Sequence, residues 1–185
     1  DTDEEYGLAD KIRSLLPDAK INILDHNTEG AVETCLIAEN LIDPELPLVI
    51  MDCDITFNAP NYFEMMHDAV ENDRYEGLLL SFDSNDPRYS FAEVDDKGIV
   101  VRTAEKVAIS SNALMGAYFF TKASTFLNAA HELMDRQLGD DMKEYYVSLI
   151  YNILIDSNKR VGLAKGDFTS FGTPEELNRY LERNK

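Results

Sequence analysis

The sequence predicts an α/β domain built on a Rossmann-like, mainly parallel but mixed sheet with helices on both faces. Helix-type and strand-type spacings of apolar residues alternate over almost all of the 185 residues. The run 47–51 is continuously apolar and has the length of a strand that is covered on both sides. The turn sequence Asp-Asp-Lys-Gly at 95–98 lies between two strand-like runs and predicts a hairpin, so the sheet is expected to be mixed.

Each expected element follows from its pattern of apolar residues. Helical spacing predicts helices over residues 6–16, 29–42, 62–71, 123–134 and 142–155. Strand-type runs are expected at residues 20–24, 47–51, 77–82, 90–94, 98–102, 114–120 and 160–164. A final helix has the clearest start, because Thr173 is placed as its N-cap, Pro174 at its first position, and Glu176 completes a capping box.

The length and the even patterning predict a single domain over residues 1–185, without repeats, linkers or low-complexity segments. The chain opens with Asp1 rather than an initiator Met, which we interpret as an N-terminally truncated piece. In sheets of this kind ligands bind beyond the carboxyl ends of the strands, so residues that follow each apolar run are the first candidates for a site.

The charge of the chain excludes several classes of partner. Asp and Glu number 35 against 17 Lys and Arg, a formal net charge of −18, which disfavours binding to nucleic acid or to anionic membrane surfaces. No run approaches the roughly 18 apolar residues of a membrane span, and no signal peptide opens the chain. Two cysteines, Cys35 and Cys53, are too few for a disulfide scaffold, so a cytoplasmic location is expected. The sequence does not indicate an oligomeric state.

The strongest chemical signal is the Asp-Cys-Asp sequence at 52–54, directly after the predicted strand 47–51. Asp52 and Asp54 are expected to point to the same side of the strand end, within reach of one cation. Carboxylate oxygens suit Mg²⁺ or Mn²⁺, ions that commonly bridge protein carboxylates and substrate phosphates. The alternative is that both carboxylates are solvated or cap the next helix.

Two weaker signals accompany it. Gly30 opens a predicted helix, where a ligand can approach the backbone and the helix N-terminus favours a phosphate, although Gly30 can equally be a simple turn residue. Lys106 is a rare cation in an acidic chain and can bind a phosphoryl group, while its neighbour Glu105 can accept a hydrogen bond from a hydroxylated substrate. An ordinary surface ion pair is the simpler interpretation of this Glu-Lys pair.

The ordered set of motifs resembles the sugar-phosphate nucleotidyltransferases, the enzymes that make nucleotide sugars on a GT-A-like fold. The resemblance covers essentially the whole chain. Its motifs are Gly-Ala-Val-Glu-Thr at 30–34, Leu-Val-Ile-Met-Asp-Cys-Asp at 48–54, Ala-Glu-Lys at 104–106, Met-Gly-Ala-Tyr-Phe-Phe at 115–120, Glu-Tyr-Tyr-Val-Ser at 144–148 and Phe-Gly-Thr-Pro-Glu-Glu-Leu at 171–177. Members similar to this pattern belong to bacterial capsule and surface-polysaccharide synthesis.

The resemblance implies a role for individual residues. Asp54 matches the family's first metal-binding aspartate with Asp52 beside it, and Gly30 matches a glycine next to the nucleobase. The Glu105 and Lys106 pair matches residues that bind the sugar phosphate. Sugar-side contacts are implied for Gly116, Glu144 and Tyr145.

The implied reaction is transfer of a nucleotidyl group from a nucleoside triphosphate to a sugar-1-phosphate, with Mg²⁺ (or Mn²⁺) as cofactor and pyrophosphate as product. Asp54 and Lys106 are the expected catalytic residues. Two departures from the pattern are evident. The family's N-terminal glycine-rich loop is absent from the sequence, and Ser170 stands where a second metal aspartate is expected, with Asp167 as the nearest substitute.

Three alternatives stay open at the level of the sequence. A metal-dependent GT-A glycosyltransferase also places Asp-x-Asp at a strand end. A phosphocholine-type cytidylyltransferase keeps the reaction and changes the acceptor. A catalytically silent domain that binds nucleotide sugars is the third. The base and the sugar are not indicated.

Overall fold

The computed structural model describes residues 5–136, 142 and 144–183. Its helices are α2 (Leu8–Leu15), α3 (Ala31–Leu36), α4 (Pro60–Asn72), α5 (Ala123–Met134), α6 (Val147–Asp156) and α7 (Pro174–Arg183), with a 3-10 turn at Glu39–Leu41. Its strands are β1 (Leu48–Met51), β2 (Ile55–Asn58), β3 (Gly77–Asp83), β4 (Ser90–Val94), β5 (Val100–Glu105), β6 (Asn112–Phe120), β7 (Val161–Lys165) and β8 (Asp167–Ser170).

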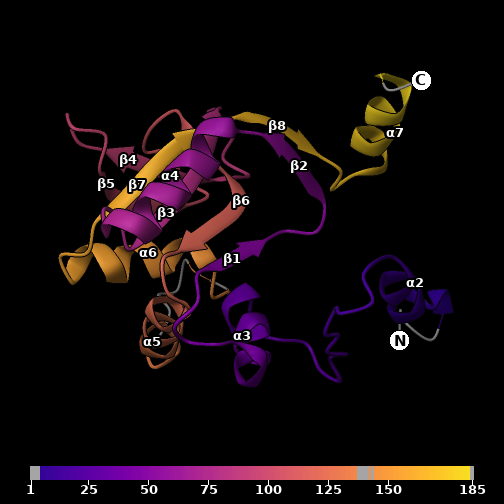
Figure 1. Cartoon of the computed structure of the whole chain (residues 1–185). Helices are drawn as coiled ribbons and strands as arrows, with labels where there is room; N and C mark the ends of the chain where they lie inside the picture. The colour runs from indigo at the N-terminus through magenta and orange to yellow at the C-terminus, as the bar shows by residue number, and fades with distance from the viewer. Residues whose placement is uncertain (1–4, 137–141, 143, 184–185) are drawn as a thin grey trace.

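A mixed central sheet with covering helices confirms the predicted α/β class, but among the described strands of this sheet only β3 and β7 pair in parallel, so neighbouring strands are mainly antiparallel rather than mainly parallel. The strand order is β5-β4-β6-β3-β7, with β1 also paired to β6. Strands β1, β3, β4 and β7 point the same way, whereas β5 and β6 run against them, as the pairings require. The remaining strands, β2 and β8, form a separate antiparallel pair beyond the end of β1 (Figure 1).

The centre of the sheet carries a bulge that matters for the site. On one edge of β6, Leu79 of β3 pairs with Tyr118 and Ser81 pairs with Leu114, so residues 115–117 face a single residue of β3. Gly116 lies inside this bulge with φ 79°, a backbone conformation that glycine adopts without strain. The bulge therefore bends β6 beside the end of β1.

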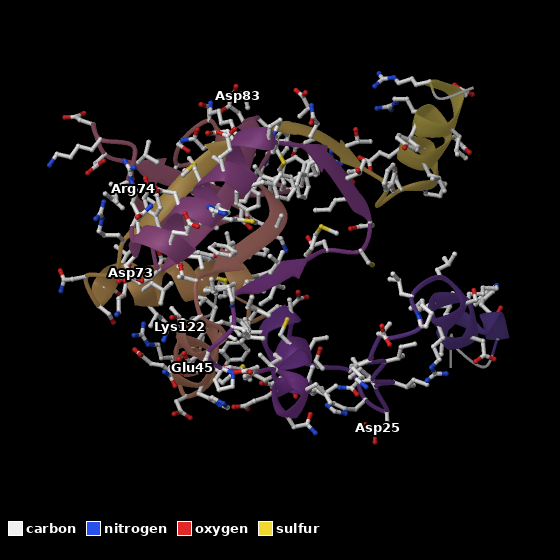
Figure 2. The ribbon with its side chains drawn as sticks, viewed as in Figure 1. Asp25, Glu45, Asp73, Arg74, Asp83 and Lys122 are labelled. Atoms are coloured by element: carbon white, nitrogen blue, oxygen red, sulfur yellow. The ribbon has the colours of Figure 1, made fainter. Side chains whose placement is uncertain are left out.

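Helices cover both faces of the sheet, as predicted (Figure 1). Alternate residues of β3 and β6 enter two separate cores because side chains on a strand point to opposite faces. One core joins Leu79 and Phe120 to α3, α5 and α6, and the other joins Leu78 and Phe119 to α4. The rim of the molecule is charged; Figure 2 shows Lys122 beside Glu45, where the two side chains form an ion pair of 2.7 Å.

The N-terminal segment differs from the prediction. Residues 20–24 were expected to form a strand, but they have no regular structure, because no strand among the described residues lies beside them to supply hydrogen bonds. Strand β1 is also covered on one face only. Leu48 and Ile50 contact the core, whereas Val49 and Met51 are about half exposed, at 51% and 52%.

Two predicted helices are shorter than their apolar patterns. The predicted helix 29–42 divides into α3 and the 3-10 turn, and the predicted helix 142–155 begins only at Val147. By contrast, α5 has the predicted bounds, and α7 begins with the predicted capping box: the Glu176 amide donates to Thr173 Oγ1 at 3.2 Å, and the Thr173 amide donates to Glu176 Oε2 at 3.2 Å. Within the described part of the chain, no helix is both long enough and apolar enough to cross a membrane.

Candidate functional site

A cavity of about 290 Å³ lies beyond the carboxyl end of β1. Side chains of the β1–β2 turn, the β4–β5 hairpin, β6, the start of α6 and β8 line it, so segments far apart in the sequence converge there. A larger cavity, of about 730 Å³, lies between α2 and residues 21–27, but none of the predicted site residues lines it. The smaller cavity is therefore the candidate site.

The two aspartates of the β1–β2 turn both line this cavity. The Asp52 amide donates to the Gly116 carbonyl at 2.9 Å, which continues the β1–β6 ladder by one residue. The carboxylate of Asp52 occupies the space that a side chain at Gly116 would need. The Asp54 carbonyl accepts a bond of 2.7 Å from the Phe171 amide, so the turn that carries Asp54 is tied to the end of β8.

The carboxylates of this site share a crowded negative field. Partial burial, followed by the charges of Asp54 and Glu105, raises the pKa of Asp52 to about 6. A neighbouring cation would relieve this repulsion. The arrangement is therefore suited to a positively charged ligand or to a metal ion that also binds phosphate oxygens.

Glu105 and Lys106 also line the cavity, at the end of β5. Glu105 accepts hydrogen bonds from the hydroxyl of Ser90, directly opposite on β4, and from Ser148 Oγ of α6 at 2.9 Å. Lys106 follows with φ 56°, and its Nζ donates to Tyr146 Oη at 2.6 Å. The hydrogen bond to Tyr146 raises the pKa of Lys106, so its ammonium stays charged at neutral pH.

Gly116 also lines the cavity, but other predicted contacts do not. At Gly30, a Cβ would lie 2.6 Å from the backbone nitrogen of Tyr145. The group that lies close to this glycine is therefore the backbone of Tyr145 rather than a ligand. The side chain of Tyr145 is 9% exposed and packs in the core, and its hydroxyl donates to the Arg136 carbonyl at 3.0 Å. Ala31 and Tyr146, the neighbours of these two residues, line the cavity instead. Glu144 is exposed outside it.

Asp167 is not brought to the cavity. It begins β8, where Phe168 and Ser170 line the site. Because alternate residues of a strand point to opposite faces, Asp167 lies on the face of Thr169, away from the cavity. Ser170 therefore occupies the position that faces Asp54. A Cβ on Gly172 would be 3.0 Å from Asp54 Oδ2 and 3.5 Å from Ser170 Oγ.

Several lining residues were missed by the sequence analysis. Ser90 could have been found from the hairpin register, since it pairs with Glu105 across the turn at 95–98. Arg88, Tyr89 and Tyr146 carry no sequence signal of their own, because they reach the cavity only through the pairing of distant segments.

Comparison with known proteins identifies the fold. No protein-family model and no curated protein sequence matches the chain significantly. Among solved structures, a nucleoside-diphosphate-sugar pyrophosphorylase from Vibrio cholerae RC9 superposes with a TM-score of 0.78 at 22% identity, over 96% of this chain and 77% of the other.

Two further structures agree with this match. A candidate glucose-1-phosphate thymidylyltransferase from Bacillus anthracis, solved with sucrose, has a TM-score of 0.72 at 17% identity, over 97% of this chain and 73% of the other. A UDP-glucose pyrophosphorylase with bound UDP-glucose has a TM-score of 0.70 at 16% identity, over 97% and 73% of the two chains. The chain therefore has the fold of nucleotide-sugar pyrophosphorylases.

Proposed function

We propose that this protein transfers a nucleotidyl group from a nucleoside triphosphate to a sugar-1-phosphate and releases pyrophosphate. One observation carries the proposal: Asp52, Asp54, Glu105 and Lys106 line one cavity of about 290 Å³, in a fold shared with nucleotide-sugar pyrophosphorylases. The rest of the proposal follows from what these side chains can do.

The reaction needs placement and charge rather than a covalent intermediate. A phosphate oxygen of the sugar-1-phosphate attacks the α-phosphorus of the triphosphate; the bond from that phosphorus to the bridging oxygen breaks, and pyrophosphate leaves with the electron pair. The Lys106 ammonium, oriented by Tyr146, would bind the incoming phosphate. Glu105, oriented by two serine hydroxyls, would accept hydrogen bonds from the hydroxyl groups of the sugar.

A divalent cation fits the donor set in a limited way. Within the described residues, no group of three or more His, Cys, Asp or Glu side chains could bind a metal ion. Asp52 and Asp54 with Ser170 leave room for water and phosphate ligands, which is the usual environment of Mg²⁺. Such an ion, when bound, would neutralise phosphate oxygens in a chain of net charge −18.

Two features of the proposal rest on the sequence alone. The resemblance to capsule and surface-polysaccharide enzymes points to precursors of such polymers as the biological product. A cytoplasmic location agrees with two free cysteines, Cys35 and Cys53.

A pyrophosphate-release assay tests the proposal. The protein is mixed with Mg²⁺, each of the four common triphosphates and a panel of sugar-1-phosphates, with phosphocholine as a further acceptor. We expect release with one base and a sugar-1-phosphate, and Asp54→Asn should abolish it. Asp73→Asn makes the same change at the exposed C-cap of α4 and should retain full activity.

The other outcomes identify the alternatives. Release only with phosphocholine indicates the cytidylyltransferase. Sugar transfer from a ready-made nucleotide sugar, without pyrophosphate, indicates the glycosyltransferase. Nucleotide-sugar binding with no turnover under any condition indicates a silent binding domain and contradicts the proposed reaction.

A further inference from the structure

A second cavity, of about 390 Å³, adjoins the candidate site. The two cavities share a wall made of Arg88, Tyr89, Phe168 and Ser170. The second cavity continues along β8 to α7, whose Arg179 and Arg183 line its far side. A ligand seated between Asp54 and Lys106 could therefore extend into it without leaving the protein surface.

The charge of the second cavity is opposite to that of the first. Three arginines line it, Arg88, Arg179 and Arg183, with Glu176 as the one carboxylate among its lining residues. In a chain of 17 basic and 35 acidic residues, such a local excess of positive charge is a distinct feature. It lies next to a site whose own carboxylates repel an oxyanion.

Glu176 offsets the charge of Arg88, with which it pairs, but not the charge of the two arginines on α7. Its carboxylate accepts hydrogen bonds from Ser170 Oγ at 3.0 Å and from the Thr173 amide at 3.2 Å, and it pairs with Arg88 Nη1 at 3.2 Å. These contacts lower the pKa of Glu176 and fix Arg88 in the shared wall.

Arg179 and Arg183 are different. Neither guanidinium forms an ion pair with a carboxylate in the described part of the chain. They are four residues apart on α7 and therefore project from the same side of the helix, where two like charges destabilise it. An oxyanion between them would remove this repulsion, and the planar fork of each guanidinium matches phosphate oxygens.

We propose that Arg179 and Arg183 form an oxyanion subsite for a pyrophosphate group. The group could be the terminal phosphates of a bound nucleoside triphosphate or free pyrophosphate, and both present negatively charged phosphate oxygens to the arginines. The inference rests on the proposed function for its choice of ligand. It adds that the C-terminal helix supplies positive charge beyond that of Lys106 and Arg88, which line the acidic transfer site.

The test is calorimetric titration of the protein with inorganic pyrophosphate in EDTA at low salt, where no metal assists binding. The Arg179→Gln/Arg183→Gln variant removes both guanidiniums. Arg74→Gln/Lys97→Gln removes the same charge at exposed positions on other parts of the surface and is the matched control. Circular dichroism verifies that all proteins are folded.

We expect the wild type and the control to bind pyrophosphate alike and the double variant to lose about tenfold or more in affinity, since hydrogen bonds to charged groups contribute at least that much. The Arg179→Lys/Arg183→Lys variant keeps both positive charges but lacks the planar guanidinium groups. Its affinity for pyrophosphate should lie between those of the wild type and the double Gln variant. Equal affinity in the wild type and the double Gln variant, or no binding by the wild type, overturns the subsite.

A second titration separates the two sources of the group. If the subsite takes the terminal phosphates, the double Gln variant loses affinity for the triphosphate found in the release assay and keeps its affinity for the monophosphate of the same base. If affinity for both nucleotides is unchanged while pyrophosphate binding is lost, the subsite takes the free product. Arginine-dependent pyrophosphate binding without turnover supports the subsite and contradicts the proposed reaction. Turnover together with pyrophosphate binding that does not depend on the arginines supports the proposed reaction and contradicts the subsite.

Discussion

The carboxylate of Asp52 lies where a side chain on Gly116 would be, so any other residue at this position in the bulge of β6 would displace the carboxylate from its position. The same glycine has φ 79°, and its carbonyl accepts the hydrogen bond of the Asp52 amide. Position 116 thus sets the direction of the Asp52 side chain without needing a side chain of its own.

Gly116→Ala should therefore abolish pyrophosphate release and destabilise the fold by about 1–3 kcal/mol, the range for a non-glycine residue in this backbone conformation. Gly98→Ala is the control. Gly98 also has a positive φ, of 77°, but open space surrounds it, so this substitution strains the backbone without displacing another side chain. Urea denaturation and the release assay measure both effects. Equal activity in the two variants would show that Asp52 does not depend on Gly116.

The raised pKa of Asp52 predicts a pH-dependent stability. Burial and the charges of Asp54 and Glu105 raise this pKa from 3.8 to about 6, so the folded chain binds the proton more tightly than the unfolded chain does. The stabilisation is present below about pH 4 and is lost as the pH rises through about 6. Asp52→Asn removes it, so the variant should gain stability relative to the wild type between pH 4 and 7.

Urea denaturation at several pH values in EDTA measures this difference. Asp73→Asn corrects for the general effect of removing one negative charge from an acidic chain. A constant difference in stability between Asp52→Asn and the wild type across the range would contradict the raised pKa.

Local patterns were sufficient for the elements that form the centre of the sheet and its covering helices. Residues 123–134 have the same bounds in the sequence prediction and in α5, and the Thr173–Glu176 capping box is present. The strand predicted at 20–24 is absent, because a β pattern becomes a strand only beside another strand. The apolar run of β1 likewise predicted a strand covered on both faces. The run alone does not determine whether another element packs against each face, and one face of β1 is half exposed.

The site was predictable where chemistry follows a strand end and unpredictable where distant segments meet. Asp52, Asp54 and Lys106, which follow strands β1 and β5, all line the cavity. Ser170 reaches it only because β8 pairs with β2, a contact between segments that are more than a hundred residues apart. Its place in the site depends on this register, which no local pattern specifies.

The hydrogen bond between Lys106 and Tyr146 allows two variants to test the charge of Lys106 and its position separately. Lys106→Gln removes the ammonium and should raise the KM for the sugar-1-phosphate by about tenfold or more, since a hydrogen bond to a charged group is lost. Tyr146→Phe keeps the aromatic ring, whose centroid is 4.7 Å from Lys106 Nζ, and removes only the hydroxyl. We expect a smaller rise in KM for this variant.

Steady-state kinetics measure both variants. Lys122→Gln is the control, because Lys122 is not among the residues that line the cavity and pairs with Glu45 instead (Figure 2). A KM for Lys106→Gln no higher than that of the control would remove Lys106 from the phosphate site.

The last prediction concerns the second carboxylate of the proposed metal site. Ser170 faces the cavity near Asp54, whereas Asp167 lies on the opposite face of β8. Ser170→Asp should therefore increase the affinity for Mg²⁺, and Asp167→Asn should leave it unchanged.

The stability of the variant gives the measurement. Without metal, the new carboxylate of Ser170→Asp lies beside Glu176, and the hydrogen bond of 3.0 Å from Ser170 Oγ to Glu176 is lost. The variant should therefore be less stable than the wild type. Added Mg²⁺ should restore its stability more than that of the wild type, because an ion that binds only the folded chain stabilises it in proportion to affinity. Thermal denaturation at increasing Mg²⁺ concentration measures this stabilisation. If Asp167→Asn instead loses the stabilisation by Mg²⁺ that the wild type shows, the ion is bound at Asp167.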